Sequence, residues 1–382
     1  MNVFRKLGLK TIINASDCYT IIGGSRMNPK VLKAMVVAAK YFVDIDLLQA
    51  KVGGKIAELT RNEAAYVTSG AAAGVVLSAA ACMTAKYPDL INKLPNTTGF
   101  PKNEFIVFES QCCENAWHLI ELAGGQLLKI KSSIETLKST INKKTAGIFF
   151  FAGSIYEENT PSIVEIIKAA KGKSMPVIVD AAAYLPPVEN MWYYTRDLGA
   201  DLVIFSGGKF IMGPQSAGLI LGKRQLIEAC CKNSNPNWMI GRPFKVSKEE
   251  MIAMLTAVEI FVSDDPNTRT EKFNKTLDYI EKNICSLSGI KTIRMDTGPL
   301  GQTFPLLTIE LPEGKDNVDC HNFLRSCDPA IDIGYYMSEG DPRWNPRHVF
   351  VSPINLKRDE LDLVIAGIRK YFHTSTVSTL KL

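Results

Sequence analysis

The sequence LVIFSGGK, residues 202–209, joins a short apolar run to a turn of small residues that ends in a lysine. An apolar run of this length indicates a strand with both faces buried, as in a parallel α/β sheet. The glycines before Lys209 let the backbone pack closely around it. Partial desolvation of a lysine in such a place favours Schiff-base formation, whereas most loop lysines are simply exposed.

Six further apolar runs of the same kind lie on either side of this segment and alternate with helical patterns. They are residues 64–68, 105–108, 127–130, 146–151, 177–180 and 217–221. This alternation is typical of an α/β fold, in which helices cover both faces of a sheet. We therefore predict a mainly parallel sheet of seven strands.

The character of the sequence changes after a long helical pattern at 247–262. The next stretch, SDDPNTRT, is polar and rich in turn-forming residues, so we place a domain boundary there. A chain of 382 residues commonly divides into two domains. We predict a large domain over 1–262 with an N-terminal arm at 1–30, and a small α+β domain over 263–382. The elements expected in the small domain are helices near 270–287 and 359–372 and strands at 304–311 and 349–352.

A second motif, VIVDAAA at residues 177–183, ends an apolar strand with an acidic residue. Ligands of open α/β sheets bind at the carboxyl ends of the strands, so Asp180 is expected to face a crevice. A carboxylate there can pair with the pyridine nitrogen of pyridoxal 5′-phosphate (PLP) and keep it protonated, which lets the ring act as an electron sink. The alternative role for Asp180 is a helix N-cap.

A third motif, TSGAAAG at residues 68–74, follows a predicted strand and opens an apolar helical run. Small residues at a helix start let backbone N–H groups approach a phosphate, and the helix dipole favours the negative charge. The alternative is that these residues only pack the helix tightly against the sheet.

Composition and charge agree with an ordinary globular enzyme. The formal charge is +5, from 44 basic and 39 acidic residues, and the lysines are scattered. We therefore expect no nucleic-acid partner, although an anionic substrate is compatible with this charge. The nine cysteines lack metal-ligand spacing, so we expect reduced thiols and no metal site. No segment reads as a signal peptide or a membrane span, and we expect a cytoplasmic protein without a membrane partner.

Taken in order with their flanking blocks, the motifs resemble a family of fold type I PLP enzymes. The family is related to selenocysteine synthase (L-seryl-tRNA(Sec) selenium transferase) and, more closely, to D-glucosaminate-6-phosphate ammonia-lyase. The resemblance covers about residues 7–264. Its blocks are INAS (13–16), GGS (23–25), ELTRNEAAYVTSGAAAG (58–74), VIVDAAAYLPP (177–187), GADLVIFSGGK (199–209), GPQSAG (213–218) and IGRPFKVSKEEM (240–251).

The resemblance implies a role for each matched position. Lys209 would carry PLP as a Schiff base, and Asp180 would pair with the pyridine nitrogen. The remaining cofactor-binding residues would be Ser69, Gly70, Ala71 and Ser206 around the phosphate, and Ala182 against one face of the ring.

The opposite face of the ring departs from the family pattern. Fold type I enzymes usually stack an aromatic residue or a histidine there, just after the strand that here ends at Glu109. This chain has Ser110-Gln111-Cys112-Cys113 instead. Cys112 is the positional candidate for stacking, and His118 is a more distant one.

The resemblance implies a PLP-dependent lyase that removes an α-proton from a small, anionic amino compound, in the manner of the ammonia-lyase. The alternatives are a selenocysteine synthase-like transferase, other PLP chemistry such as an aminotransferase, racemase or decarboxylase, and a non-catalytic PLP-binding protein. Selenocysteine synthases carry an additional N-terminal domain, whereas the first matched block here is at 13–16, so we expect no tRNA substrate.

Three arginines are candidates for binding the substrate, because a guanidinium group binds carboxylates and phosphates through two hydrogen bonds. They are Arg242, Arg347 and Arg26. Structural ion pairing is the alternative for Arg242 and Arg347. Arg26 lies in GGSRMNP, residues 23–29, a loop that we expect to complete the active site of a neighbouring subunit in a homo-oligomer, although it could equally be a surface turn.

Overall fold

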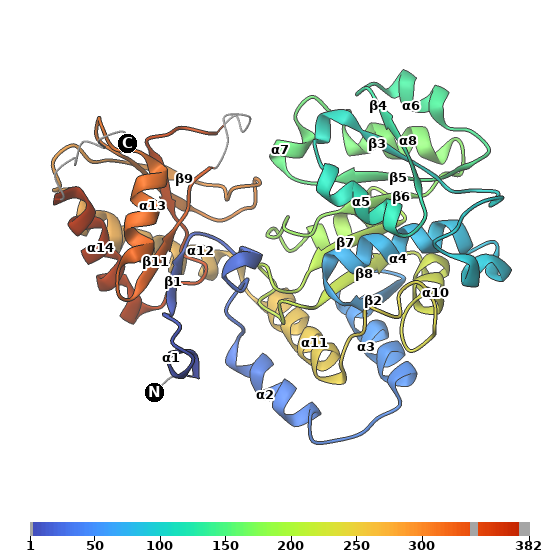
Figure 1. Ribbon diagram of the computed structural model, residues 1–382, viewed down its shortest axis with the longest axis horizontal. Helices are drawn as coiled ribbons and strands as arrows, with labels where there is room; N and C mark the ends of the chain where they lie inside the picture. The colour runs from blue at the N-terminus through green and yellow to red at the C-terminus, as the bar shows by residue number, and fades with distance from the viewer. Residues whose placement is uncertain (1–2, 337–342, 374–382) are drawn as a thin grey trace. The chain divides into compact units, whose positions relative to one another are not determined.

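The computed structural model describes residues 3–336 and 343–373 and divides into two compact units (Figure 1). One unit is Arg26–Asp264, and the other joins Met1–Ser25 to Asp265–Leu382. The N-terminal segment belongs to the second unit because β1 (Ile12–Ala15) pairs in parallel with β11 (Ala330–Ile333). This differs from the predicted N-terminal arm of the large domain. Pairing between segments so distant in sequence leaves no local signal.

The larger unit contains a seven-stranded sheet with the order β2-β8-β7-β6-β5-β3-β4. Strand β8 runs antiparallel to both of its neighbours, and the other strands share one direction. The strands are β2 (Ala64–Thr68), β3 (Glu104–Phe108), β4 (Gln126–Ile130), β5 (Thr145–Phe151), β6 (Val177–Asp180), β7 (Leu202–Ser206) and β8 (Gly218–Gly222). Each predicted strand is present with bounds within one residue, so the mainly parallel sheet is confirmed.

Burial explains why these runs form the centre of the unit. All seven residues of β5 are buried, on both faces of the strand. Helix α4 (Gly70–Thr84) is buried over most of its surface and packs on β5, β7 and β8 (Figure 1). The other helices of the unit are α2 (Pro29–Ala38), α3 (Ile45–Leu59), α5 (Glu114–Leu122), α6 (Ile134–Thr140), α7 (Ser154–Glu157), α8 (Ile163–Lys171), α9 (Asn190–Trp192), α10 (Arg224–Asn233) and α11 (Lys248–Ser263). Short 3-10 or π turns are Pro88–Lys93, Glu109–Gln111 and Tyr193–Asp197.

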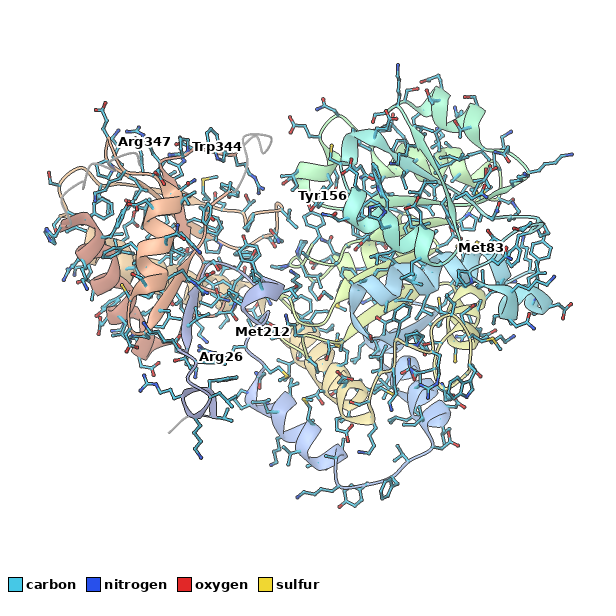
Figure 2. All side chains as sticks on the ribbon, viewed as in Figure 1. Arg26, Met83, Tyr156, Met212, Trp344 and Arg347 are labelled. Atoms are coloured by element: carbon cyan, nitrogen blue, oxygen red, sulfur yellow. The ribbon has the colours of Figure 1, made fainter. Side chains whose placement is uncertain are left out.

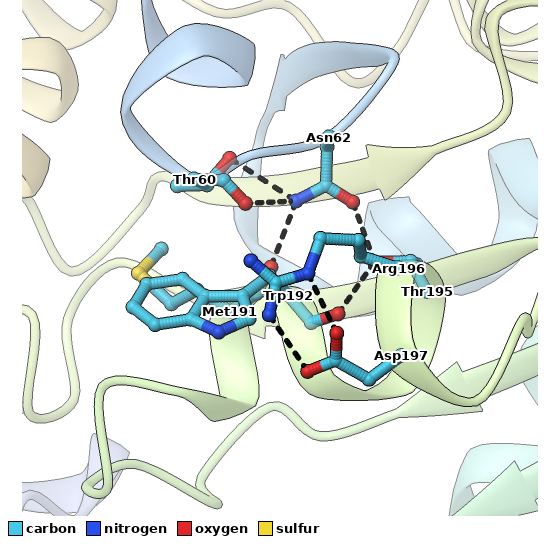
Figure 3. Close-up of polar contacts among 7 residues, drawn as sticks. All are labelled: Thr60, Asn62, Met191, Trp192, Thr195, Arg196 and Asp197. Carbon is cyan, nitrogen blue, oxygen red and sulfur yellow. Dashed lines mark hydrogen bonds and ion pairs between the residues drawn. The ribbon is translucent and has the colours of Figure 1, made fainter.

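A side-chain network fixes the segment that leads into β7 (Figure 3). The amide nitrogen of Asn62 donates to the carbonyl oxygens of Thr60 (2.7 Å) and Met191 (2.8 Å). Thr195 Oγ1 donates to the amide oxygen of Asn62 at 2.6 Å. The turn before β2 is thereby tied to the helical segment before β7, two stretches that are far apart in sequence.

The smaller unit is an α+β module with a three-stranded antiparallel sheet in the order β12-β10-β9. Its elements are α1 (Val3–Lys6), α12 (Pro266–Ile284), β9 (Lys291–Met295), β10 (Leu306–Glu310), α13 (Asn317–Ser326), β12 (His348–Val351) and α14 (Leu361–His373), with 3-10 turns at Thr20–Ile22 and Arg358–Glu360. The stretch SDDPNTRT, predicted as a turn, is instead the start of α12: Asp265 caps the helix by accepting from the Thr268 N–H (2.9 Å), and Pro266 takes the first helical position.

Among residues 3–336 and 343–373, we find no helix with the length and apolar character needed to cross a bilayer.

Candidate active site

Asp180 and Ser206 lie at the carboxyl ends of the adjacent parallel strands β6 and β7. The Ser206 N–H donates to the Ala182 carbonyl at 3.0 Å, and the Ala152 N–H after β5 donates to the Asp180 carbonyl at 2.8 Å. These peptide bonds bring the ends of β5, β6 and β7 to one edge of the sheet. This is the edge at which ligands bind in open α/β folds.

The surroundings of the Asp180 carboxyl group disfavour its negatively charged form. Burial raises the pKa of Asp180 from its ordinary 3.8 to about 6, and the hydrogen bond from the Ala182 N–H (3.0 Å) offsets only part of that rise. The next helix, α9, begins only at Asn190, so Asp180 is not a helix N-cap. A desolvated carboxylate with one weak donor is well matched to a positively charged partner such as a protonated ring nitrogen.

Lys209 lies in a turn directly after β7, and glycines make that turn possible. A Cβ on Gly207 would lie 2.8 Å from the Ala217 carbonyl oxygen, and one on Gly208 would lie 2.4 Å from Gln215 Cα. The Gly207 N–H donates to that same Ala217 oxygen at 2.8 Å. Lys209 is half-buried as a result, so the turn holds it close to the end of β7, next to the strand that carries Asp180.

The segment that follows this turn is anchored to α11. Ser216 Oγ donates to the carboxylate of Glu250, a residue of the capping box that opens that helix. The two residues of this pair are 34 positions apart in the sequence, so no local pattern predicts it. Its effect is to tie the segment between Lys209 and β8 to the start of α11.

The start of α4 forms a tight backbone cradle. Gly70 adopts a left-handed conformation (φ +80°), and Thr68 Oγ1 donates to the Gly70 carbonyl at 2.8 Å. A Cβ on Gly218 would lie 2.7 Å from the Ala71 nitrogen, so the backbone at the start of β8 packs directly against this turn. The side chain at the N-cap position, Ser69, makes no capping hydrogen bond, which leaves the first N–H groups of a fifteen-residue helix available to an anion.

The candidate Cys112 and its neighbour Cys113 occupy different environments. Cys112 is exposed and has a left-handed backbone (φ +45°). Cys113 is half-buried, and its thiol donates to the Gln111 carbonyl at 3.0 Å. Burial raises the pKa of Cys113, and the negative charge of Asp180 raises it further. The Cys113 thiol is therefore near enough to the Asp180 carboxylate to feel its charge, and Cys112 stays the predicted candidate for stacking on the ring.

The other side chains of this region have structural partners. Gln111 is buried and bonds both peptide groups of Phe151 at the end of β5, at 2.9 and 3.1 Å, which ties the end of β3 to that of β5. A buried glutamine after a strand leaves no periodic pattern that could have revealed it. His118 is exposed on α5 and pairs with Glu121 at 2.9 Å.

The three candidate arginines differ in what they contact. Arg242 stacks on Trp238, with its guanidinium carbon 4.7 Å from the ring centroid, and its buried Nε has no hydrogen-bond partner in the described chain. Arg347, in the smaller unit, donates from Nη2 to the Glu310 carboxylate at 2.6 Å (Figure 2). Arg26 is exposed in the larger unit, shortly before α2 (Figure 2). Arg242 thus retains a buried donor for an anion, while Arg347 is already engaged in an ion pair.

These features fit PLP. The uncapped start of α4 and the glycine cradle suit a phosphate, the half-buried Asp180 carboxylate suits a protonated ring nitrogen, and Lys209 supplies the amine beside it.

Comparison with known proteins agrees with this assignment. Residues 101–245 match the aminotransferase class-V family. The D-glucosaminate-6-phosphate ammonia lyase of Salmonella typhimurium is 34% identical over 68% of this chain and 69% of that protein. The 5′-C-glycyluridine monooxygenase-decarboxylase of a Streptomyces species is 27% identical over 77% of this chain and 74% of that protein. An L-seryl-tRNA(Sec) selenium transferase of Carboxydothermus hydrogenoformans is 25% identical over 65% of this chain but only 54% of that protein.

A solved structure of D-glucosaminate-6-phosphate ammonia-lyase superimposes with a TM-score of 0.83 and 25% sequence identity, covering 97% of this chain and 98% of the other. Both the sequence relative and the structural neighbour therefore point to the same group. The chain belongs to the family of PLP-dependent fold type I enzymes that contains D-glucosaminate-6-phosphate ammonia-lyase.

Proposed function

We propose that the protein is a PLP-dependent lyase that releases ammonia from a phosphorylated amino sugar acid. The 34% identity to an ammonia lyase over about two thirds of both chains supports the reaction class. One observation carries the proposal. The Asp180 carboxylate, whose pKa is raised by desolvation, and the Lys209 turn, which is formed by glycines, lie at the carboxyl ends of adjacent strands.

Each residue of the site has a defined task in this proposal. The Ala182 N–H orients the Asp180 carboxylate, which holds a proton at the ring nitrogen of the cofactor. The N–H groups at Gly70 and Ala71, with Ser206, bind the cofactor phosphate. When bound, PLP stabilises negative charge that develops at the substrate α-carbon.

Lys209 supplies the base. Its Nζ atom would hold the cofactor in the resting enzyme, and with substrate bound the free amine would take the proton from the substrate α-carbon. Loss of the β-hydroxyl group as water, followed by hydrolysis that takes up one water and releases the amino group, then gives a keto acid and ammonia. Ala182 and a thiol, Cys112 or Cys113, flank the ring, and a thiol packs there as a small apolar group.

Arg242 is the proposed anchor for the anionic end of the substrate. Its buried Nε lacks a partner, and an unsatisfied buried donor is costly unless a ligand completes it. Stacking on Trp238 fixes the plane of the guanidinium group and so favours two-point binding of a carboxylate or phosphate. Arg347 and Arg26 are further candidates, with Arg347 already paired to Glu310.

The protein is further proposed to act as a homo-oligomer. The segment after α2 exposes Tyr41 (64%) and Phe42 (100%), and Val36 on α2 is 61% exposed. A groove of about 460 Å³ lies between α2, this segment, α3 and α11. A second copy of the chain would cover these apolar side chains, which are costly to leave in water. Arg26 lies just before α2, so the same contact would present it to the partner.

A cytoplasmic location is part of the proposal. All nine cysteines are free thiols, and none of them forms a disulfide in the described chain. Reduced thiols in this number are typical of a reducing compartment.

The direct test supplies the PLP-loaded enzyme with D-glucosaminate 6-phosphate and measures ammonia and 2-keto acid together. Equal amounts of the two products, and a much lower rate with unphosphorylated D-glucosaminate, are the expected result. Carbon dioxide in place of ammonia would instead favour decarboxylation, the chemistry suggested by the name of the Streptomyces relative. No product from any amino sugar acid would reject the proposal.

A further inference from the structure

A second concave site lies at the amino-terminal ends of the strands in the larger unit's sheet. It is a pocket of about 370 Å³, within the range of small-molecule sites. Its walls come from the residues just before β3, β6 and β7, from the start of β5, from the end of α4 and from Lys223, which directly follows β8. The carboxyl ends of the strands, where Asp180 lies, are one strand length away. For β7 the rise of about 3.3 Å per residue over four residues gives a distance of roughly 13 Å.

Positive charge dominates the pocket. Four lysines line it, Lys86, Lys102, Lys171 and Lys223, together with a single carboxylate, Asp201. Four ammonium groups less one carboxylate leave three positive charges. Asp201 is itself occupied, because it pairs with Lys223 at 2.5 Å and accepts from the Val177 N–H at 2.8 Å. The other three ammonium groups have no carboxylate partner among the described residues.

Two of these lysines are positioned by the backbone around them. Lys102 Nζ donates to the Thr145 carbonyl at 2.7 Å, and Lys171 Nζ donates to the Leu198 carbonyl at 3.3 Å. A Cβ on Gly199 would lie 2.6 Å from Lys171 Nζ, so glycine at this position makes room for the ammonium group. The pKa of Lys102 is lowered by burial and by repulsion from Lys86, so the two charges are close enough to oppose each other.

The remaining wall is largely apolar. Ala85, Met175 and Leu226 contribute alkyl surface, and Tyr87 contributes an aromatic side chain. Unpaired positive charges beside an apolar wall match a ligand with two or more negative charges and a carbon body.

We propose that this lysine pocket binds a phosphate-bearing small molecule at a site separate from the cofactor. Helix α4 runs between the two sites, because Gly70 at its start belongs to the cofactor cradle and Cys82 near its end lines the pocket. The ligand is either a nucleotide or a sugar phosphate, which share the phosphate ester. This inference does not rest on the proposed reaction.

Calorimetric titration of the PLP-loaded, borohydride-reduced protein with pyrophosphate at low ionic strength tests the site. Reduction keeps the cofactor's own phosphate site filled, so that pyrophosphate reports on the lysine pocket and on the anion site proposed at Arg242. We expect saturable binding, and the part of it that Lys86→Glu removes belongs to the lysine pocket. Parallel titrations with AMP and glucose 6-phosphate distinguish the two sources, since the tighter of the two identifies the ligand class.

The main variant is Lys86→Glu, because Lys86 is exposed and its side chain makes no hydrogen bond to the backbone of the described residues. It should weaken pyrophosphate binding at least tenfold. Lys171→Gln should weaken it less, by removing one charge. The matched control is Lys138→Glu, an exposed lysine on α6 that does not line the pocket and makes the same change in net charge.

Binding that is absent in the parent protein, or equally weakened by Lys86→Glu and Lys138→Glu, would overturn the proposal. The first result would show that the pocket does not bind pyrophosphate. The second would show that the weaker binding follows from the change in net charge alone. The titration measures binding and not activity, so its result can be interpreted even if the ammonia assay gives no product.

Discussion

A Cβ atom placed on Gly218 would lie 2.5 Å from the carbonyl carbon of Gly70, so the start of β8 and the start of α4 touch through their backbones. No flexible side chain lies between them that could move aside. The shape of the proposed phosphate cradle therefore depends on the absence of a side chain at residue 218, on a strand that itself contributes no ligand.

Gly218→Ala should consequently lower the affinity for PLP at least tenfold. The added methyl group forces the two backbones apart, and overpacking of this kind costs about 1–3 kcal/mol. Spectroscopic titration with PLP measures the affinity, and thermal unfolding of the cofactor-free protein measures the cost to the fold. Gly172→Ala is the control, because a Cβ there meets nothing closer than the Ala169 carbonyl oxygen at 3.6 Å. Unchanged PLP affinity in Gly218→Ala would show that the cradle is not where the phosphate binds.

Lys209 should be the residue that borohydride reduction links to PLP. Mass spectrometry of the digested, reduced protein should find the cofactor on the peptide containing Lys209. Lys209→Ala should still bind PLP through its phosphate but should lose turnover, whereas Lys143→Ala, which alters an exposed lysine, should be fully active. A label on a different lysine contradicts the assignment.

Asp180→Asn should reduce kcat by a hundredfold or more. An amide cannot hold a proton at the ring nitrogen, and removal of a preorganised charge partner costs on the order of 3 kcal/mol in the barrier. Steady-state rates at saturating PLP measure the loss without interference from weaker cofactor binding. Activity close to that of the parent would show that Asp180 is not needed to keep the ring nitrogen protonated.

The same carboxylate predicts how the stability of the cofactor-free protein depends on pH. Its pKa rises from 3.8 to about 6 on folding, so between these values the folded state binds the proton and the unfolded state does not. Stability therefore falls as pH rises through this window, by at most about 3 kcal/mol at pH 7. Urea unfolding at pH 4.5 and 7 should show this loss in the parent and not in Asp180→Asn, which should be the more stable protein at pH 7. An equal loss in both proteins would assign the pH effect to other groups.

The elements that sequence could predict are those with a strong local signal. The sheet of the larger unit was predictable because strands such as β5 are buried along their whole length and read as unbroken apolar runs. Strand β9 was not, because its residues alternate between exposed and half-buried and include three polar ones. The pairing of β1 with β11 joins opposite ends of the chain and has no local signature.

The candidate site divides in the same way. Asp180 and Lys209 follow strand ends, where topology makes side chains converge, and so they could be named from sequence. The coupling of Cys113 to Asp180 and the free Nε of Arg242 depend on packing between distant segments. Position after a strand pointed to Cys112, which the fold leaves exposed.

Arg242→Lys should raise KM for a phosphorylated substrate about tenfold or more while leaving PLP affinity unchanged. Lysine keeps the charge but loses the planar fork and the stacking on Trp238, so an effect of this size requires two-point binding. The comparison is Arg347→Lys, since Arg347 is already paired with Glu310. A change in thermal stability without a change in KM would identify Arg242 as a structural residue.

Mixing two inactive proteins tests whether Arg26 serves the site of a partner subunit. Lys209→Ala lacks the base, and Arg26→Ala should lack the proposed substrate contact. If the two residues act at one site but come from different chains, a mixed dimer has one site with both defects and one site with none. Random exchange of subunits makes half of the dimers mixed, so about a quarter of the parent activity should return. If both residues serve the site of their own chain, every site in the mixture keeps one defect, and no activity returns. Ultracentrifugation of the same mixture confirms that dimers form, and a fully active monomer would reject the shared site altogether.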